Sequence, residues 1–206
     1  MLLEGVEIGA SGIAKIAAGG LSFFVRLDFW ESLEHEPARI AAGSDLDDEE
    51  AIDLVLSAKA TEAEARGASL LARQEQPRFL LRAKLIDRGY PDRAVALALD
   101  RLESEGFLSD RRYALVWLRS RIGKALRGRG GRAEGPSTLL GSLRARSLSE
   151  EDAKAALAAV LDTETRRSLL AAAAGRLGIE GESAFHELRG LGFTGEEIRE
   201  FREVRE

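Results

Sequence analysis

KLIDRGYPDRAVALALDRLESEGFLSDRRYALVWLRSRI, residues 84–122, is the stretch that decides the fold. Helical spacing is shared by the apolar residues Val95, Ala98, Leu99 and Leu102. Pro91 fits a first helical turn because its missing N–H would have no partner there, and Gly106 supplies a left-handed helix end. We expect Phe107, just past that glycine, to pack back on the last turn. The stretch therefore predicts helices joined by tight corners.

The same pattern occurs twice more downstream. Alignment of Leu85 with Leu143 and with Leu188 brings together three corners: Gly89-Tyr90-Pro91, Ser147-Leu148-Ser149 and Gly192-Phe193-Thr194. Apolar positions recur after each corner, and the last copy loses its final apolar position at Arg205, as a terminal repeat can. Each copy is about three helices long. The fold class is therefore mainly α, with three tandem three-helix repeats in an extended curved array behind a small N-terminal β element.

These patterns divide the chain into five parts. They are a small β element (1–44), a connecting helix (45–60), repeat one (61–107), repeat two with a basic Gly/Arg loop (108–161) and repeat three (162–206).

Three runs in this order resemble the RecX regulatory proteins: KLIDRGY, LDRLESEGFLSDRRYALVWLRSR and GPSTLLGSLRARSL. The resemblance covers roughly residues 61–206 and is strongest over residues 81–161. It implies three tandem three-helix repeats that bind the filament of the RecA recombinase on single-stranded DNA. It also implies inhibition of the ATPase, strand-exchange and coprotease activities of that filament, and thus a role in homologous recombination, DNA repair and the SOS response.

The composition is that of a globular chain. With 206 residues, 45% hydrophobic and 32% charged, it can bury a sizeable core and has no membrane-spanning character. The chain has no Cys, which excludes disulfides and thiolate chemistry. No export signal is visible, so we expect a cytoplasmic protein with no membrane partner, and a monomer.

Charge is distributed unevenly along the chain. Residues 1–60 hold 4 Lys and Arg against 12 Asp and Glu, residues 61–147 hold 18 against 10, and residues 148–206 hold 8 against 13. A positive middle between negative ends indicates an acidic partner such as a phosphate backbone or an acidic protein surface.

The N-terminal part has strand-like composition. Gly19-Gly20 between residues 13–16 and 21–29 predicts a two-residue hairpin turn. We expect a third strand over residues 38–41. From its separate composition, we also expect that removal of residues 1–44 would leave the repeats folded.

Helix starts follow from capping residues. We expect Asp45 to cap a helix that continues past Thr61 with a kink there or at Gly67. Ser109 caps the next repeat's first helix, and Ser149 with Asp152 is expected to start its last helix in the manner of a capping box. The helix that Ser109 caps carries on one side Tyr113, Val116, Trp117 and Ser120, and we place Tyr113 and Trp117 in the core rather than on a stacking surface. Thr163 caps repeat three, with helices near 164–177, 182–190 and 195–204.

Catalytic chemistry is not indicated, and we expect no enzyme. The glycines between residues 128 and 135 lack the strand and the spacing of a nucleotide-binding loop. His35 and His186 have no metal-ligand partner at helical spacing, so no metal or cofactor is predicted. Acidic clusters fall in first helical turns, where capping explains them.

A basic set remains as the candidate filament- or DNA-binding site. Its members are Arg78, Arg82, Lys84, Arg88, Arg119, Arg121, Lys124, Arg127, Arg129, Arg132, Arg144 and Arg146. Any single arginine can be explained as a solvated helix face or as a partner of a nearby carboxylate. The clustering favours a binding surface, because phosphates and carboxylates gain from many unpaired cations.

Three functions fit these observations. The first is regulation of the RecA–single-stranded DNA filament. The second is sequence-nonspecific binding of single- or double-stranded DNA without RecA, although the helices after the corners carry no evident base-reading face. The third is a helical-repeat scaffold.

Overall fold

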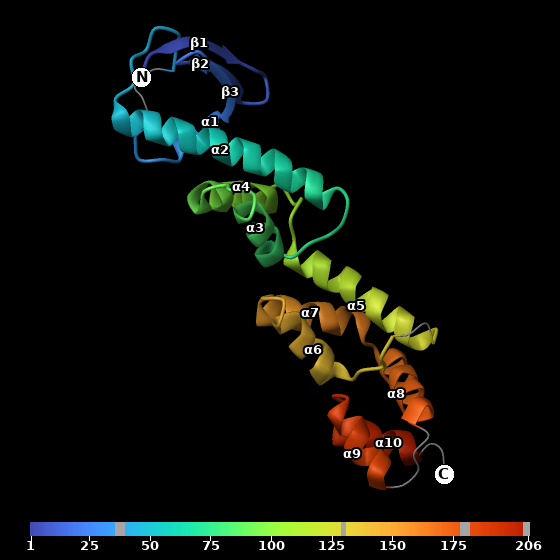
Figure 1. Ribbon diagram of the computed structural model, residues 1–206. Helices are drawn as coiled ribbons and strands as arrows, with labels where there is room; N and C mark the ends of the chain where they lie inside the picture. The colour runs from blue at the N-terminus through green and yellow to red at the C-terminus, as the bar shows by residue number, and fades with distance from the viewer. Residues whose placement is uncertain (36–39, 129–130, 178–181, 204–206) are drawn as a thin grey trace. The chain divides into compact units, whose positions relative to one another are not determined.

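The computed structural model describes residues 1–35, 40–128, 131–177 and 182–203 (Figure 1). The strands are β1 (Leu3–Ile8), β2 (Ile13–Ala18) and β3 (Leu21–Arg26). The helices are α1 (Leu27–Glu31), α2 (Asp48–Leu71), α3 (Arg78–Ile86), α4 (Asp92–Ser104), α5 (Asp110–Leu126), α6 (Pro136–Arg144), α7 (Glu150–Val160), α8 (Thr163–Leu177), α9 (Glu182–Gly190) and α10 (Gly195–Glu203). The chain forms two compact units, unit 1 (Met1–Leu108) and unit 2 (Ser109–Glu206). The mainly α class with a small N-terminal sheet is confirmed, while the repeat boundaries and the curved array stay predictions.

The hairpin lies where the sequence predicts it, between β2 and β3. Gly19 and Gly20 have φ of 57° and 73°, as a two-residue turn that matches the strand twist requires. The predicted strand over residues 21–29 is too long, because β3 ends at Arg26 and Leu27 begins α1.

The third strand is β1, which pairs antiparallel with β2. The prediction of a strand over residues 38–41 is not supported: residues 38 and 39 lie outside the described residues, and Ile40 and Ala41 are not in a strand. Farther along the chain, Gly43 and Ser44 form backbone hydrogen bonds with Leu3, at the start of β1. Gly43 has a φ of 88°, a conformation that ends extended pairing.

The sheet and α2 share one core. Ile16 and Val25 from the sheet, Trp30 from α1, and Leu54 and Ala58 from α2 are all buried in it. An isolated sheet of this size would have only marginal stability. Helix α2 supplies the apolar surface against which the sheet packs. The expectation that the repeats stay folded without residues 1–44 stays a prediction, and the loss of these residues would expose the apolar face of α2 that the sheet covers.

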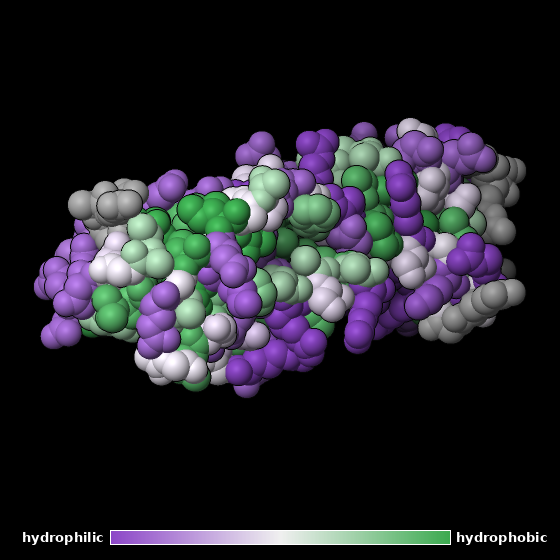
Figure 2. All heavy atoms as spheres, turned by 90° about the horizontal axis from the view of Figure 1, so that it is seen from above, coloured by the Kyte–Doolittle hydropathy of each residue, from purple (hydrophilic) through white to green (hydrophobic). Residues whose placement is uncertain are grey.

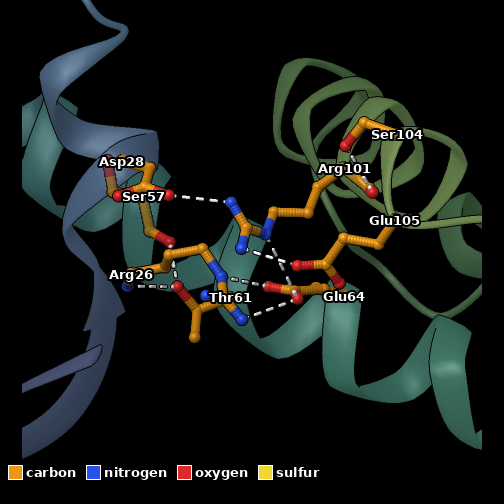
Figure 3. A network of polar contacts seen from close by, with 8 residues as sticks. All are labelled: Arg26, Asp28, Ser57, Thr61, Glu64, Arg101, Ser104 and Glu105. Carbon is orange, nitrogen blue, oxygen red and sulfur yellow. Dashed lines mark hydrogen bonds and ion pairs between the residues drawn. The ribbon is translucent and has the colours of Figure 1, made fainter. Parts of the chain in front are cut away.

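A buried ion pair joins the end of β3 to α2 (Figure 3). The Arg26 guanidinium donates to both oxygens of Glu64 at 2.7 Å, and the two side chains are only 12% and 10% exposed. Burial disfavours the charged form of Arg26, but the hydrogen bond to Glu64 and the charge of that carboxylate outweigh it and raise the pKa of the guanidinium. Arg101 of α4 extends the network to Asp28 at 2.7 Å.

We expect the Arg26→Met variant to lower the free energy of unfolding by about 2 kcal/mol, because it leaves the Glu64 carboxylate buried without its main partner. The double variant Arg26→Met with Glu64→Leu is expected to recover most of that loss. Urea unfolding followed by circular dichroism measures both. A single variant no less stable than the double one would contradict this account.

Helix α2 runs from Asp48 to Leu71 with no break at Thr61 or Gly67. Its cap is Asp47 rather than Asp45. The Asp47 carboxylate accepts from Glu50 N at 2.8 Å, and the Glu50 carboxylate accepts from Asp47 N at 2.9 Å.

Gly67 lies at a close contact between α2 and α4 in unit 1. A Cβ there would lie 2.7 Å from Cδ1 of Leu102 on α4. The residue that packs back on the end of α4 is Leu108, whose N–H donates to Leu102 O at 2.9 Å. Leu108 is buried, whereas Phe107, which we expected in that place, is exposed.

In unit 2 the predicted caps hold for two helices and shift for a third. Ser109 accepts from Arg112 N, and Ser149 accepts from Asp152 N at 3.0 Å. For α8 the cap is Asp162 rather than Thr163: its carboxylate accepts from Thr165 N at 2.7 Å, and these hydrogen bonds lower its pKa.

The apolar side of α5 differs from the predicted one. Its buried residues are Ala114, Leu118, Ile122 and Ala125. Val116 and Ser120, which we placed on the apolar side, are exposed, while Tyr113 and Trp117 are partly buried against the core. The predicted helices of repeat three agree with α8, α9 and α10 within one residue.

The three aligned corners share one backbone conformation. Gly89, Ser147 and Gly192 have φ of 87°, 59° and 90°. Ser147 is the only non-glycine residue among the described ones with a positive φ, a conformation that costs a side-chain-bearing residue energy. The alignment of corners made from the sequence is therefore matched by the backbone.

Two loops of unit 2 cross at backbone contact. Gly135 N donates to Leu191 O at 2.8 Å, and Ser137 N donates to Gly192 O at 3.2 Å. A Cβ on Gly135 would lie 2.3 Å from the carbonyl carbon of Gly192, and one on Gly192 would meet the backbone N of Thr138 at 2.6 Å. Only glycines permit this approach, which ties the start of α6 to the corner between α9 and α10.

We expect Gly135→Ala to lower the free energy of unfolding of unit 2 by about 2 kcal/mol, because backbone atoms cannot move aside as side chains can. Gly141→Ala is the matched control. Gly141 lies exposed on α6 with nothing near its would-be Cβ, so alanine should stabilise by roughly 0.5–1 kcal/mol. Thermal and urea unfolding of both variants measure these changes. Equal changes in the free energy of unfolding would contradict a backbone contact at Gly135 that only glycine permits.

Candidate functional site: a cationic surface

The basic residues of unit 1 pair with their own neighbours. Arg78 at the start of α3 contacts Asp100 at 2.6 Å and Glu103 at 2.7 Å, both on α4. Arg82 contacts Asp92 at 2.6 Å. These side chains join α3 to α4, and their partners neutralise the charge that they would offer to another molecule.

The other two cations of this group have polar partners. Lys84 Nζ donates to Gln76 Oε1 at 2.5 Å, and Arg88 donates to Lys84 O at 2.7 Å. All four residues of the predicted set in unit 1 are therefore engaged within the chain.

In unit 2, Arg121 of α5 is also a structural residue. Its guanidinium donates to both carboxylate oxygens of Glu134 at 2.7 and 2.8 Å, and the Glu134 side chain is 7% exposed. The hydrogen bond to Glu134 raises the pKa of Arg121 in spite of its partial burial. Arg121 is therefore committed to Glu134.

Trp117 lies between two arginines. The Arg121 guanidinium carbon is 5.2 Å and that of Arg146 is 4.5 Å from the ring centroid. Arg146 also donates to Ser142 O at 2.5 Å. These contacts hold the corner after α6 against α5 and occupy the indole ring, so Trp117 is a packing residue.

Four other predicted residues of unit 2 are exposed: Arg119, Lys124, Arg127 and Arg132. Within the part of the chain that the structure describes, none of the four has a carboxylate within 4 Å in an ion pair. Arg144 is exposed too, but it lies 3.7 Å from Glu150, whose pKa is lowered mainly by the hydrogen bond from Lys154 and also by Arg144. Arg129 lies outside the described residues.

Arg119, Lys124 and Arg127 form one side of α5, which we call the α5 stripe. At 100° per residue they span a sector of roughly 140°, centred opposite the buried residues of that helix. The stripe therefore faces away from the core of unit 2, and Arg132 follows it in the next loop.

The boundary between the units also separates the charge. Residues 61–108 contain eight Lys and Arg and eight Asp and Glu, whereas residues 109–147 contain ten against two. The positive surplus of the chain's middle thus belongs to unit 2.

Glu134 shapes the site, although it was not among the residues predicted from the sequence. A signal was present, because it is the sole acidic residue between Asp110 and Glu150. A lone carboxylate within a run of arginines is expected to take one of them as its partner.

The described residues contain no cluster of three or more His, Asp or Glu side chains placed to hold a metal ion. Among the same residues, no helix is both long and apolar enough to cross a membrane.

The fold and this surface define a helical-repeat protein with an exposed cationic helix face. No family model matches the sequence. The regulatory protein RecX of Xanthomonas axonopodis pv. citri is 34% identical over 140 residues, which cover 65% of this chain and 82% of that protein. The regulatory protein RecX of Treponema pallidum (strain Nichols) is 33% identical over 108 residues, which cover 52% of this chain and 62% of that protein. The chain belongs to the RecX family of regulatory proteins.

Solved structures agree in fold. A crystal structure of a regulatory protein RecX matches with a TM-score of 0.71 at 19% identity, covering 98% of each chain. RecX from Lactobacillus salivarius matches with a TM-score of 0.56 at 16% identity, covering 71% of this chain and 96% of that one.

We expect Arg121→Ala to lower the free energy of unfolding by about 2 kcal/mol, because the Glu134 carboxylate would stay buried without its cation. Arg119→Ala on the same helix should change it by less than about 0.5 kcal/mol, since Arg119 is exposed. Adding Glu134→Gln to Arg121→Ala should restore part of the loss. Urea unfolding of the three variants tests this, and an unperturbed Arg121→Ala protein would refute the structural role.

Proposed function

We propose that this protein binds the RecA–single-stranded DNA filament and inhibits its ATPase, strand-exchange and coprotease activities. Membership of the RecX family carries the proposal. The protein acts by binding, as a cytoplasmic monomer, and needs no cofactor. Its tandem helical repeats suit a filament, because repeated units can contact successive subunits.

We assign the electrostatic part of the contact to the α5 stripe and Arg132. These four residues are exposed, and none of them has an ion pair among the described residues. Their charges can therefore interact with phosphates or carboxylates of the filament. Arg78, Arg82, Arg121 and Arg146 have partners within the chain, so they contribute less. Arg129 remains in the proposed set from its position in the sequence alone.

The alternative is sequence-nonspecific DNA binding without RecA. The α5 stripe is also the feature that supports this second function, because Lys and Arg contacts to phosphates give affinity for any DNA backbone, whatever its sequence. Binding of labelled single- and double-stranded oligonucleotides in the absence of RecA separates the two.

The test is the ATPase rate of RecA on single-stranded DNA with increasing amounts of this protein. We expect inhibition by the parent. The variant Arg119→Ala, Lys124→Ala, Arg127→Ala should need about tenfold more protein for half-inhibition, a loss of about 1.4 kcal/mol. Inhibition by the parent should also weaken steeply with salt, and less steeply for the variant, because fewer counterions are released.

The matched control is Arg167→Ala, Arg199→Ala, Arg202→Ala. These three arginines of unit 2 are also exposed and, within the described residues, lack an ion pair. The control should inhibit like the parent, with melting curves unchanged for both triple variants. Equal inhibition by the two triple variants would remove the α5 stripe from the contact. A parent that binds DNA but leaves the ATPase rate unchanged would favour the alternative function.

A further inference from the structure

β1 forms one edge of the N-terminal sheet, whose strand order is β1-β2-β3 (Figure 1). The other edge, β3, lies beside α2, where Arg26 N donates to Thr61 Oγ1 at 2.8 Å. β1 pairs with β2 along one side only. Its second side is the one place in the described sheet where a further strand can add.

The hydrogen-bond pattern identifies the groups on this free side. Gly9 N donates to Ile13 O at 2.9 Å, and the pairing register continues as Glu7 opposite Lys15. Because bonded and non-bonded pairs alternate in an antiparallel ladder, Val6 and Ile8 direct their N–H and C=O groups away from β2.

Farther back along β1, the outward groups of Leu3 are taken by Gly43 and Ser44. Those of Val6 and Ile8 have no backbone partner among the described residues. β1 therefore presents four main-chain groups that a strand could pair with.

The surroundings of this edge are partly apolar. Val6 packs against the core on the inner face, and Ile8 beside it is 58% exposed. An open groove of about 850 Å³ adjoins the edge, and its lining includes Glu7, Ile8, Lys15 and the 60% exposed Phe24 from the sheet and Ala65 from α2. On the face drawn in Figure 2, hydrophobic residues reach the surface between hydrophilic ones.

Charge disfavours a second copy of this chain as the occupant. Antiparallel self-pairing that uses all four free groups places Val6 opposite the other copy's Ile8. That register sets Glu7 directly opposite the second Glu7 in a non-bonded pair, where the backbones are closest and like charges repel. A strand with a cation opposite Glu7 is attracted to that carboxylate, whereas a second copy of β1 is repelled by it.

We propose that β1 is a docking edge for an extended segment of a partner protein in which a Lys or Arg stands between two apolar residues. The segment adds a fourth strand through the main-chain groups of Val6 and Ile8. Its two apolar side chains extend the inner face of the sheet, and its cation lies on the outer face across from Glu7.

The wider charge of this region agrees with a basic partner segment. Residues 1–60 carry 12 Asp and Glu against 4 Lys and Arg. Lys15 is the cross-strand neighbour of Glu7 on β2, and no ion pair joins the two within the described residues. The carboxylate of Glu7 is thus available to a cation on the free side.

The experiment uses the full chain and a fluorescein-labelled seven-residue peptide of alternating Val and Lys, with alternating Val and Glu as the control peptide. Fluorescence anisotropy should show the Val-Lys peptide bound at least about tenfold more tightly than the Val-Glu peptide. Ile8→Pro removes one outward N–H and leaves the β1–β2 ladder intact. It should weaken binding by about tenfold, whereas Ile8→Ala, which keeps the N–H, should change it less than threefold.

Glu7→Lys should reverse the order of the two peptides, and this exposed position keeps the test valid if Ile8→Pro does not fold. Circular dichroism verifies the fold of each variant. Equal binding of both peptides by the parent, or parent-like binding by Glu7→Lys, overturns the proposal. Sedimentation that shows dimers of the parent but not of Ile8→Pro would assign the edge to a second copy and overturn it as well.

Discussion

The helical part of this structure depends on a backbone constraint: at each of the three aligned corners, the chain passes from one helix to the next through a residue with a positive φ. Gly89, Ser147 and Gly192 each meet it. The third corner has a second duty, because Gly192 also lies in backbone contact with Gly135 before α6. Gly192 thus serves the corner after α9 and also permits the backbone contact with Gly135 before α6. Packing of unit 2 is therefore sensitive to a side chain added at Gly135 or at Gly192.

Much of the fold was predictable because its signals are local. Helical periodicity, Ser109 and Ser149 as caps, and the Gly19-Gly20 turn depend on residues close in sequence, and the structure contains them. The errors arose where neighbouring residues of similar chemistry compete for one place. Leu108 rather than Phe107 fills the end of α4, and packing makes that choice. Asp47 rather than Asp45 completes a reciprocal cap with Glu50, and the three-residue spacing of that pair makes the choice locally.

The contacts between the N-terminal sheet and the helices were not predictable from the sequence for a related reason. Composition marks residues 1–44 as different, but it does not reveal that α2 needs a cover. The buried pair of Arg26 and Glu64 joins residues 38 positions apart, and Arg101 reaches Asp28 across 73. Such pairs have no periodic signal in the sequence, yet they make the sheet an integral part of unit 1.

The candidate binding site shows the same limit in its charges. A basic set defined by clustering treats all arginines alike, although their value to a partner depends on which carboxylates they already contact. Arg78 meets two carboxylates 22 and 25 residues away, whereas Arg119 meets none among the described residues. With residues 61–108 balanced and residues 109–147 strongly positive, the surplus lies on unit 2. The proposed contact therefore uses cations of α5 that have no ion pair among the described residues, because charges already neutralised within the chain must first give up their own partners.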